Sequence, residues 1–395
     1  MRVPRSGCGG LDTGEGREEG VAMKREEWST VALIISLPIF AGALLNNDQI
    51  DFAFVAELPT TPPVVTRRKG RRQTPSKASE PAAGTLPVLN VPAPNNVETL
   101  ALLLEAHPDY RVLRRLKPCL SWPTPEPGQT ICHVLVLDTE TTGLNQSKDK
   151  IIELALLRFD VDTVNGMPVG QVQVYDGLED PGTPIPKEVQ GITGIDDAMV
   201  RGQSLDEARI AEMMRGVNLV IAHNAGFDRP FVEARLPQFR ALAWACSFAD
   251  IDWREQGRGS AKLESLALEL GYFYDAHRAE MDCHALLAVL ACPLPKTRHT
   301  GLAHLLERAA RPSYQLQATN APFEAKDRLK DRGYRWNGDQ KVWHTRLDDA
   351  PALQAELVWL KAEVYSHRQA AVQVEKLDAG VRYSSRAGEL VRHPL

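Results

Sequence analysis

Residues 133–140 read HVLVLDTE, an apolar run that ends in two carboxylates. A continuous apolar run of this kind is typical of a strand that is buried on both faces of a sheet. Alternate side chains of a strand share a face, so Asp138 and Glu140 are expected to project to the same side. Two carboxylates held side by side repel each other unless a cation lies between them. The stretch therefore predicts half of a metal site.

Around this strand, the apolar patterns predict further strands and helices in a definite order. Two more strands are expected at 151–160 and 169–178, joined to their neighbours by short polar turns. After them come a helix at 205–214, a buried strand at 218–224 and helices at 227–235, 261–270 and 280–290. This order is typical of a ribonuclease H-like α/β fold, in which a mixed sheet is flanked by helices. We assign it to residues 131–293.

Two aspartates and a histidine fall where they could join the first two carboxylates. Asp228 lies at the start of one predicted helix and Asp282 in the first turn of another, positions where the helix dipole favours a carboxylate. His277 precedes Asp282 on a loop, and an imidazole titrates near neutral pH and can take a proton from water. Ordinary helix-start charges and a plain loop histidine are the alternative. The combined order and spacing favour a nuclease site.

The segments DTETTG (138–143), HNAGFD (223–228) and HRAEMD (277–282) resemble the three motifs of DnaQ-like DEDDh 3′–5′ exonucleases. The spacing of the histidine and aspartate in the third segment matches the histidine branch of that family. IPKEVQGITGI (185–195) also resembles the family's loop and helix before the fourth strand. The resemblance runs from about Cys132 to Cys292 and implies a ribonuclease H-like fold.

The resemblance also implies a mechanism with two divalent ions, Mg²⁺ or Mn²⁺. Asp138 would bridge both ions, Glu140 and Asp282 would complete the ion beside the nucleophile, and Asp228 would hold the other. His277 would act as the general base. The products would be nucleoside 5′-monophosphates, released from the 3′ end of a polynucleotide.

Five further residues are candidates for substrate binding. Thr141, Thr142 and Leu144 follow Glu140, where the family's equivalent loop contacts the terminal sugar and base, but plain turn residues are the alternative. His223 and Asn224 end the strand before Asp228 and could line the side of the scissile phosphate, although a structural role explains them equally well.

The predicted function is a metal-dependent exonuclease that acts on single-stranded or 3′-end nucleic acid, DNA in the first place, in proofreading or DNA repair. An RNA-trimming exoribonuclease is the alternative, because the motifs do not fix recognition of the 2′-hydroxyl. A non-catalytic scaffold on the same fold is disfavoured, because a pure binder of an anion has no reason to keep carboxylates together. Polymerase motifs are not seen, so a DNA polymerase or repair partner would act in trans. The oligomeric state is not indicated.

Composition excludes other classes of protein. The net charge of −5 over 395 residues gives no overall basic surface, so contacts with nucleic acid must be local. Six cysteines without a CxxC pair argue against a zinc module or a disulfide framework and fit a reducing, cytoplasmic setting.

The first 130 residues carry weaker patterns. Residues 1–94 are expected to be low in complexity and disordered. The apolar run at 31–45 is shorter than the roughly 20 residues of a membrane span, so no membrane contact is expected. A signal peptide at 23–43 is the alternative for this run. Residues 95–130 are expected to form a short helical prefix.

A small α+β domain is predicted at 312–375, with a strand, a helix and a hairpin that turns at Asn337 and Gly338. On the hairpin, aromatic rings and cations could form a stacking platform for single strands, namely Trp336, Trp343, Arg335 and Lys341. A hydrophobic core built on the two tryptophans is the alternative. Residues 376–395 are expected to be a polar tail. Because all five catalytic candidates precede Ser313, residues from there onward are expected to be dispensable for hydrolysis of a dinucleotide.

Overall fold

The computed structural model describes residues 97–366 and 369–395, all within the unit that spans Pro87–Leu395. The predicted low-complexity region 1–94, with its apolar run at 31–45 and the alternative signal peptide at 23–43, lies outside the described residues. None of the described helices is long and apolar enough to cross a bilayer.

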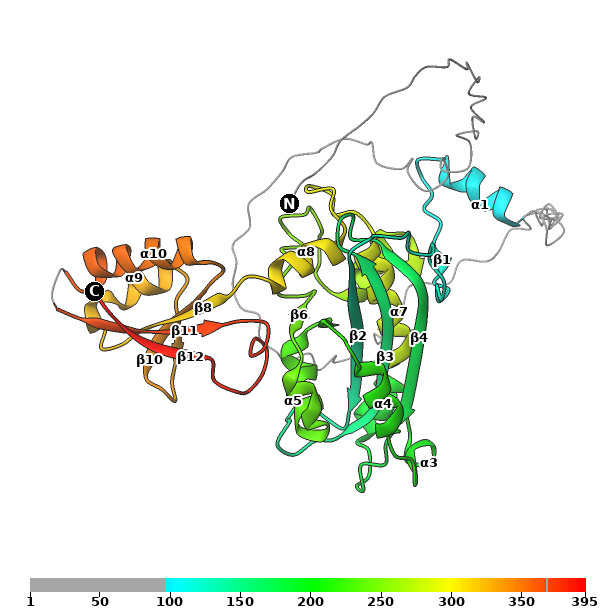
Figure 1. Ribbon diagram of the computed structural model, residues 1–395, viewed down its shortest axis with the longest axis horizontal. Helices are drawn as coiled ribbons and strands as arrows, with labels where there is room; N and C mark the ends of the chain where they lie inside the picture. Colours follow the sequence, from blue (N-terminus) through cyan, green and yellow to red (C-terminus); the bar gives the residue numbers. More distant parts are fainter. Residues whose placement is uncertain (1–96, 367–368) are drawn as a thin grey trace, which may run out of the picture. The chain divides into compact units, whose positions relative to one another are not determined.

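A five-stranded mixed sheet occupies the centre of the predicted exonuclease region. In spatial order its strands are β4 (Pro168–Leu178), β3 (Ile151–Asp162), β2 (Ile131–Thr141), β5 (Leu219–Ala222) and β6 (Trp244–Cys246). β2, β3 and β4 are antiparallel neighbours and lie side by side in Figure 1. β5 and β6 run parallel to β2. This topology confirms the predicted ribonuclease H-like fold.

Helices cover both faces of this sheet, because β2 is apolar on both sides. Val134 and Val136 belong to the core shared with α6 (Leu263–Glu269), α7 (Ala279–Ala291) and α8 (Gly301–Ala309). Leu135 and Leu137 face the other core, with α4 (Glu207–Met214), α5 (Ala225–Arg235) and the 3-10 turn η2 (Pro237–Ala241). By the same alternation, β2 presents Asp138 and Glu140 on the α7 face. The short helices α2 (Lys187–Thr193) and α3 (Asp197–Val200) lead from β4 to α4.

The prefix predicted at 95–130 is only partly helical. α1 (Val97–Glu105) forms, but none of its residues is buried. The apolar residues from Val112 to Leu116 do not continue a helix, and β1 (Arg114–Arg115) pairs instead with β7 (Tyr272–Phe273). The helical spacing was misleading here, because the backbone N–H groups of Arg114 and Leu116 donate to the carbonyls of Gly271 and Phe273.

A second five-stranded sheet follows α8. In spatial order its strands are β12 (Glu389–Pro394), β11 (Ala371–Leu377), β8 (Ser313–Ala318), β10 (Val342–Leu347) and β9 (Arg335–Asn337). One face packs against α9 (Lys326–Asp331) and α10 (Ala350–Trp359), with the single turns η3 (Phe323–Ala325) and η4 (Leu360–Val364) beside them. The expected hairpin is present, with Asn337 opposite Val342.

The expectation of a polar tail at 376–395 is wrong. β11 extends to Leu377, and β12 pairs with β11 along its length. Residues 378–386, which we call the docking segment, bind α5 and β6. Backbone pairing and buried arginines hold this part of the chain, and neither leaves an apolar pattern in the sequence. The domain boundaries proposed at 131–293 and 312–375 stay predictions.

Candidate active site

Three carboxylates from two elements meet on the α7 face of the central sheet. Asp138 and Glu140 come from the end of β2, and Asp282 comes from the first turn of α7. One oxygen from each of the three lies within 4.8 Å of the others. Like charges this close are stable only when they are protonated or bound to a cation. We call these residues, together with Asp228, the carboxylate cluster.

The Asp282 carboxylate is held by three donors. The Tyr274 hydroxyl donates to Oδ1 at 2.8 Å, and the backbone N–H groups of His277 and Arg278 donate to Oδ2 at 2.8 and 3.2 Å. His277 has a left-handed backbone with φ of 65°. This turn brings two N–H groups of the 277–282 motif onto the carboxylate of the same motif, so the side chain of Asp282 is oriented before any ligand binds.

Asp228 approaches the cluster from the other side of β2. It lies in the first turn of α5 and is 2% exposed. The backbone N–H and the hydroxyl of Thr139 donate to its Oδ1 at 3.2 and 2.8 Å. Asp228 is not within the 4.8 Å group, but its charge raises the pKa of Asp138. The structure therefore brings all four predicted carboxylates together, three of them closely.

Burial and mutual repulsion dominate the electrostatics of the cluster. Burial, followed by the charges of the other carboxylates, raises the pKa of Asp138 well above its usual range and that of Glu140 to about 8. Burial also raises the pKa of Asp228 to about 7 and that of Asp282, although the hydrogen bonds to both carboxylates oppose the shift. An empty, fully ionised state of this cluster is therefore unfavourable, and either protons or a cation would relieve the repulsion.

Comparison with known proteins identifies the family to which this chain belongs. Residues 135–290 match the sequence model of the family described as "Exonuclease". The chain is 30% identical over 159 residues to the DNA polymerase III subunit epsilon of Treponema pallidum. The matched segment covers 38% of this chain and 71% of that subunit. The chain belongs to the DnaQ-like family of 3′–5′ exonucleases.

Other relatives match a smaller part of their own length. A PolC-type DNA polymerase III of Caldanaerobacter subterraneus is 28% identical over 184 residues, which is 44% of this chain but only 12% of the polymerase. Among solved structures, Exonuclease X in complex with 5′ overhanging duplex DNA is 26% identical, covers 43% of this chain and 99% of its own, and has a TM-score of 0.32. E. coli Exonuclease I in complex with a dA16 oligonucleotide is 19% identical, covers 47% and 48%, and has a TM-score of 0.34.

A fifth carboxylate of this exonuclease lies beside the cluster and was missed from the sequence. Glu153 on β3 is fully buried and pairs across the sheet with Glu140. It forms an ion pair with Arg278 at 2.7 Å and accepts the backbone N–H of Ala279 at 2.8 Å. Glu153 thereby ties β3 to the start of α7. The signal in the sequence was a single charge inside the apolar run IIELALL.

His277, the predicted general base, lies next to Asp282 of this cluster. Its side chain is exposed, and its charge lowers the pKa of Asp282. No hydrogen bond fixes its imidazole to another part of the described chain, so the ring is held only through its backbone. Its role as the base stays a prediction.

The five candidates for substrate binding divide into two groups. The hydroxyls of Thr141 and Thr142 are buried and donate within their own turn, to the Gly143 carbonyl at 2.6 Å and to Asp149 at 3.3 Å. Leu144 is 81% exposed beside them and is free to meet a substrate.

His223 and Asn224 hold the connection between β5 and α5. Nδ1 of His223 is 2.7 Å from the Ser247 hydroxyl, and burial lowers the pKa of this imidazole to about 4, so it is neutral at physiological pH. Asn224 is exposed and left-handed, with φ of 70°, at the start of α5. The described contacts of both residues are structural.

The four hairpin candidates do not share one surface. Trp336 and Trp343 are cross-strand partners in edge-to-face contact, with ring centroids 5.5 Å apart. Trp343 packs against the core of the C-terminal sheet, while Trp336 is 52% exposed. Arg335 precedes Trp336 and therefore projects from the opposite face. Lys341 lies exposed in the turn.

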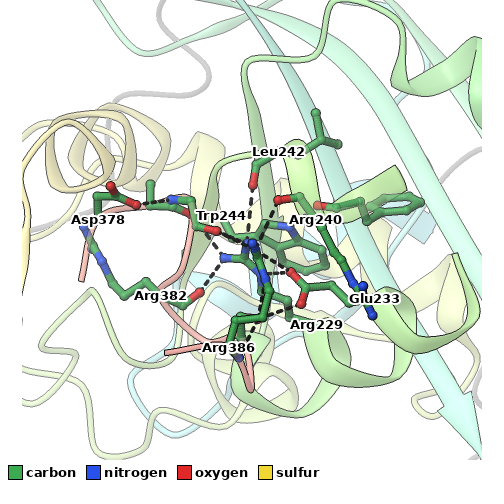
Figure 2. A network of polar contacts seen from close by, with 12 residues as sticks. Arg229, Glu233, Arg240, Leu242, Trp244, Asp378, Arg382 and Arg386 are labelled. Carbon is green, nitrogen blue, oxygen red and sulfur yellow. Dashed lines mark hydrogen bonds and ion pairs between the residues drawn. The ribbon is translucent and has the colours of Figure 1, made fainter. Parts of the chain in front are cut away.

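A second group of buried charges begins one residue after Asp228 (Figure 2). Arg229 is fully buried and forms an ion pair with Glu233 at 2.7 Å. Its guanidinium also donates to backbone carbonyls of the docking segment, those of Ala379, Gly380 and Arg382. Glu233 in turn accepts from Ser384 at 2.6 Å and from Arg386 at 3.1 Å. We call Arg229, Glu233 and the docking segment the arginine clamp.

Asp250 completes the attachment of the docking segment. It accepts from Arg382 at 3.3 Å and from the Tyr383 hydroxyl. The N–H of Trp244 on β6 donates to Ala379, which adds a backbone contact at 2.8 Å. The helix that carries Asp228 is therefore completed by residues about 150 positions later in the chain.

Proposed function

We propose that this exonuclease binds two divalent cations, Mg²⁺ or Mn²⁺, and removes nucleoside 5′-monophosphates from the 3′ end of DNA. The observation that carries the proposal is the approach of one oxygen each of the half-buried Asp138, Glu140 and Asp282 to within 4.8 Å of one another. Carboxylate oxygens are the ligands that these hard cations prefer. The donor set therefore fits the ions that the family resemblance implies.

The family resemblance suggests a role for each carboxylate. Asp138 is influenced by all the others and would bind both ions, Glu140 and Asp282 would complete one ion, and Asp228 the other. When bound, such ions make a water nucleophilic and stabilise charge on the departing oxygen. Tyr274 and the turn at His277 keep the Asp282 carboxylate in place.

His277 would take the proton from the attacking water. Its exposed imidazole can reach the entrance of the cluster, and the turn after it is anchored to Asp282. A base on a loop can move onto the substrate while its backbone stays fixed.

The relatives support DNA as the substrate, because the Treponema relative is a DNA polymerase III subunit. By the same argument, the chain would act in the cytoplasm in proofreading or repair, with a DNA polymerase or repair protein as a partner in trans.

Digestion of DNA and RNA oligonucleotides of matched sequence tests the proposal. With Mg²⁺ or Mn²⁺, a 5′-labelled DNA strand should give a ladder of shortened products and free 5′-monophosphates, and EDTA should stop the reaction. Asp138→Ala should be inactive, whereas Asp339→Ala, an exposed aspartate in the hairpin turn, should match the parent. Faster digestion of RNA would reverse the preference, and hydrolysis that continues in EDTA would refute the metal mechanism.

A further inference from the structure

A groove runs from the start of α5 to the C-terminal sheet. A hollow of about 710 Å³ is lined by Gly226 and Pro230 of α5, by Gln146 and by residues of β9 and β10. A second hollow, of about 390 Å³, shares Gln146, Gly226 and Pro230 with the first and extends to Leu144. Both volumes fall within the roughly 300–1,000 Å³ of ligand pockets. We call the two hollows together the basic groove.

The C-terminal side of this groove is the sheet face that the helices leave uncovered. Arg335 pairs across the strands with His344, and Arg346 pairs with Gln315. Cross-strand partners share a face, and the opposite face carries Leu316, which is buried against the helices. The uncovered face therefore presents polar and basic side chains.

The groove carries an excess of positive charge. Arg335 and Arg346 are exposed, and neither forms an ion pair within the described part of the chain. The Arg346 guanidinium lies over the Tyr383 ring, 5.2 Å from its centroid. Arg386 also lines the groove but is bound to Glu233. The one lining carboxylate is Glu375, which accepts the backbone N–H of Gly388.

The basic groove and the carboxylate cluster are built partly on the same two segments, α5 and the turn after β2. Gly226 lies two residues before Asp228 on the same helix, and Leu144 and Gln146 follow Glu140 in the turn after β2. A strand whose 3′ end lies at the cluster would therefore meet the groove with its preceding nucleotides.

We propose that the basic groove binds the phosphodiester backbone of single-stranded nucleic acid, on the 5′ side of the nucleotide that is removed. This inference rests on the proposed exonuclease function. A basic groove that follows the backbone is a common way to hold a single strand without reading its sequence. Trp336 and Trp343 face away from the groove. Arg335 and Arg346 would supply phosphate contacts, so binding should depend strongly on salt.

The test compares the full-length parent with the double variant Arg335→Gln, Arg346→Gln. Binding is measured in EDTA by fluorescence anisotropy of a labelled oligodeoxythymidylate of about 20 nucleotides, longer than the roughly 4–16 that single-strand-binding folds cover. The double variant should bind roughly tenfold more weakly, and two lost phosphate contacts should reduce the slope of log affinity against log salt by about 1.4. In Mg²⁺, kcat/KM for this strand relative to a dinucleotide should fall.

Arg328→Gln is the matched control, because Arg328 is an exposed arginine on α9, which packs against the other face of the sheet. It should bind as the parent does. Arg346→Lys keeps the charge and should retain most of the affinity, whereas a loss equal to that of Arg346→Gln would mean that the contact with Tyr383, not the charge, holds the strand. If the double variant has unchanged affinity, salt slope and midpoint of thermal unfolding, the basic groove does not bind the strand and the proposal is wrong. Binding that is lost in the double variant while the parent hydrolyses nothing would support the groove and refute the exonuclease proposal.

Discussion

Asp228 and Arg229 are neighbours on α5, yet they belong to two different groups of charges. The charges of one group repel one another, and those of the other are paired. The carboxylate cluster gathers acids whose pKa values are raised by burial and by one another. The arginine clamp matches each buried charge with an opposite charge or a carbonyl dipole.

This difference in pairing distinguishes a group of charges that binds a ligand from one that holds the fold together. A buried charge without a partner costs free energy, so it persists where a ligand supplies the missing charge. A buried charge that is fully paired adds little net stability, but removing one partner is costly. The contribution of the carboxylate cluster to stability should therefore change with metal and with pH. The contribution of the arginine clamp should change with neither.

The largest effect is expected for Asp138→Ala. The substitution removes the carboxylate shared by the proposed ions, so hydrolysis in Mg²⁺ should fall below detection. It also removes one of the mutually repelling carboxylates, so the midpoint of thermal unfolding in EDTA should rise. Digestion assays and thermal unfolding of the same preparation check both results. Near-parental activity would show that the cluster is not the site.

His277→Ala should lower kcat by roughly 10²–10⁴-fold, which is the usual contribution of a general base. The imidazole is not a ligand of the cluster, so Mg²⁺ should protect the variant from thermal unfolding as well as it protects the parent. Single-turnover digestion measures the chemical step. An unchanged rate would remove His277 from the mechanism and leave the carboxylates as proposed.

Arg229→Ala should act on stability rather than on the response to metal. It leaves the docking-segment carbonyls without their guanidinium donor and takes from Glu233 its buried partner, with only Ser384 and Arg386 still bound to it. Breaking such a buried pair costs about 3–5 kcal/mol. Urea unfolding in EDTA and in Mg²⁺ should show the same loss. Arg209→Ala, at an exposed ion pair with Glu212, is the control and should change stability little. A loss of unfolding free energy that appears only without Mg²⁺ would mean that the arginine clamp and the carboxylate cluster are energetically coupled.

An effect confined to the metal-free protein is a dependence of its stability on pH. The raised pKa values mean that the folded protein keeps protons that the unfolded chain releases near about pH 4. The corresponding stability is full below that pH and is lost as the pH rises through the pKa of Asp228, about 7, and that of Glu140, about 8. The midpoint of thermal unfolding in EDTA should therefore fall between about pH 5 and 8.

Mg²⁺ should flatten this dependence on pH, because it replaces the protons in the cluster. Asp138→Ala should show a shallower fall than the parent, and Arg229→Ala should keep the parental slope from a lower midpoint. A midpoint in EDTA that does not change with pH would mean that the cluster is less buried, or less repulsive, than its geometry indicates.

The sequence predicted the central sheet and the meeting of the carboxylates because both depend on local pattern. The alternation of β2 puts Asp138 and Glu140 on one face, and two helix starts bring Asp228 and Asp282 to the same edge. Glu153 was missed because its role comes from a cross-strand neighbour, which no single segment reveals.

The docking segment could not be predicted for a different reason. Its carbonyls bind Arg229, and every residue type carries the same carbonyl, so the pattern of side chains holds no signal. The expectation that residues from Ser313 onward are dispensable for dinucleotide hydrolysis therefore needs revision. Removing them would take away the carbonyls that Arg229 binds and the donors of Ser384 and Arg386 to Glu233, on the helix that carries Asp228.

The arginine clamp also sets an order of events during synthesis. Arg229 is made 150 residues before Ala379, which at about 5–20 residues per second is a delay of roughly 8–30 s. Through that interval the nascent nuclease has its acidic motifs but lacks the carbonyls that complete the helix bearing Asp228. A ribosome that stalls before the docking segment would release a fragment with a solvated, loosened α5, open to proteases. The contacts that hold α5 in place are complete only in chains that have been translated past Arg386.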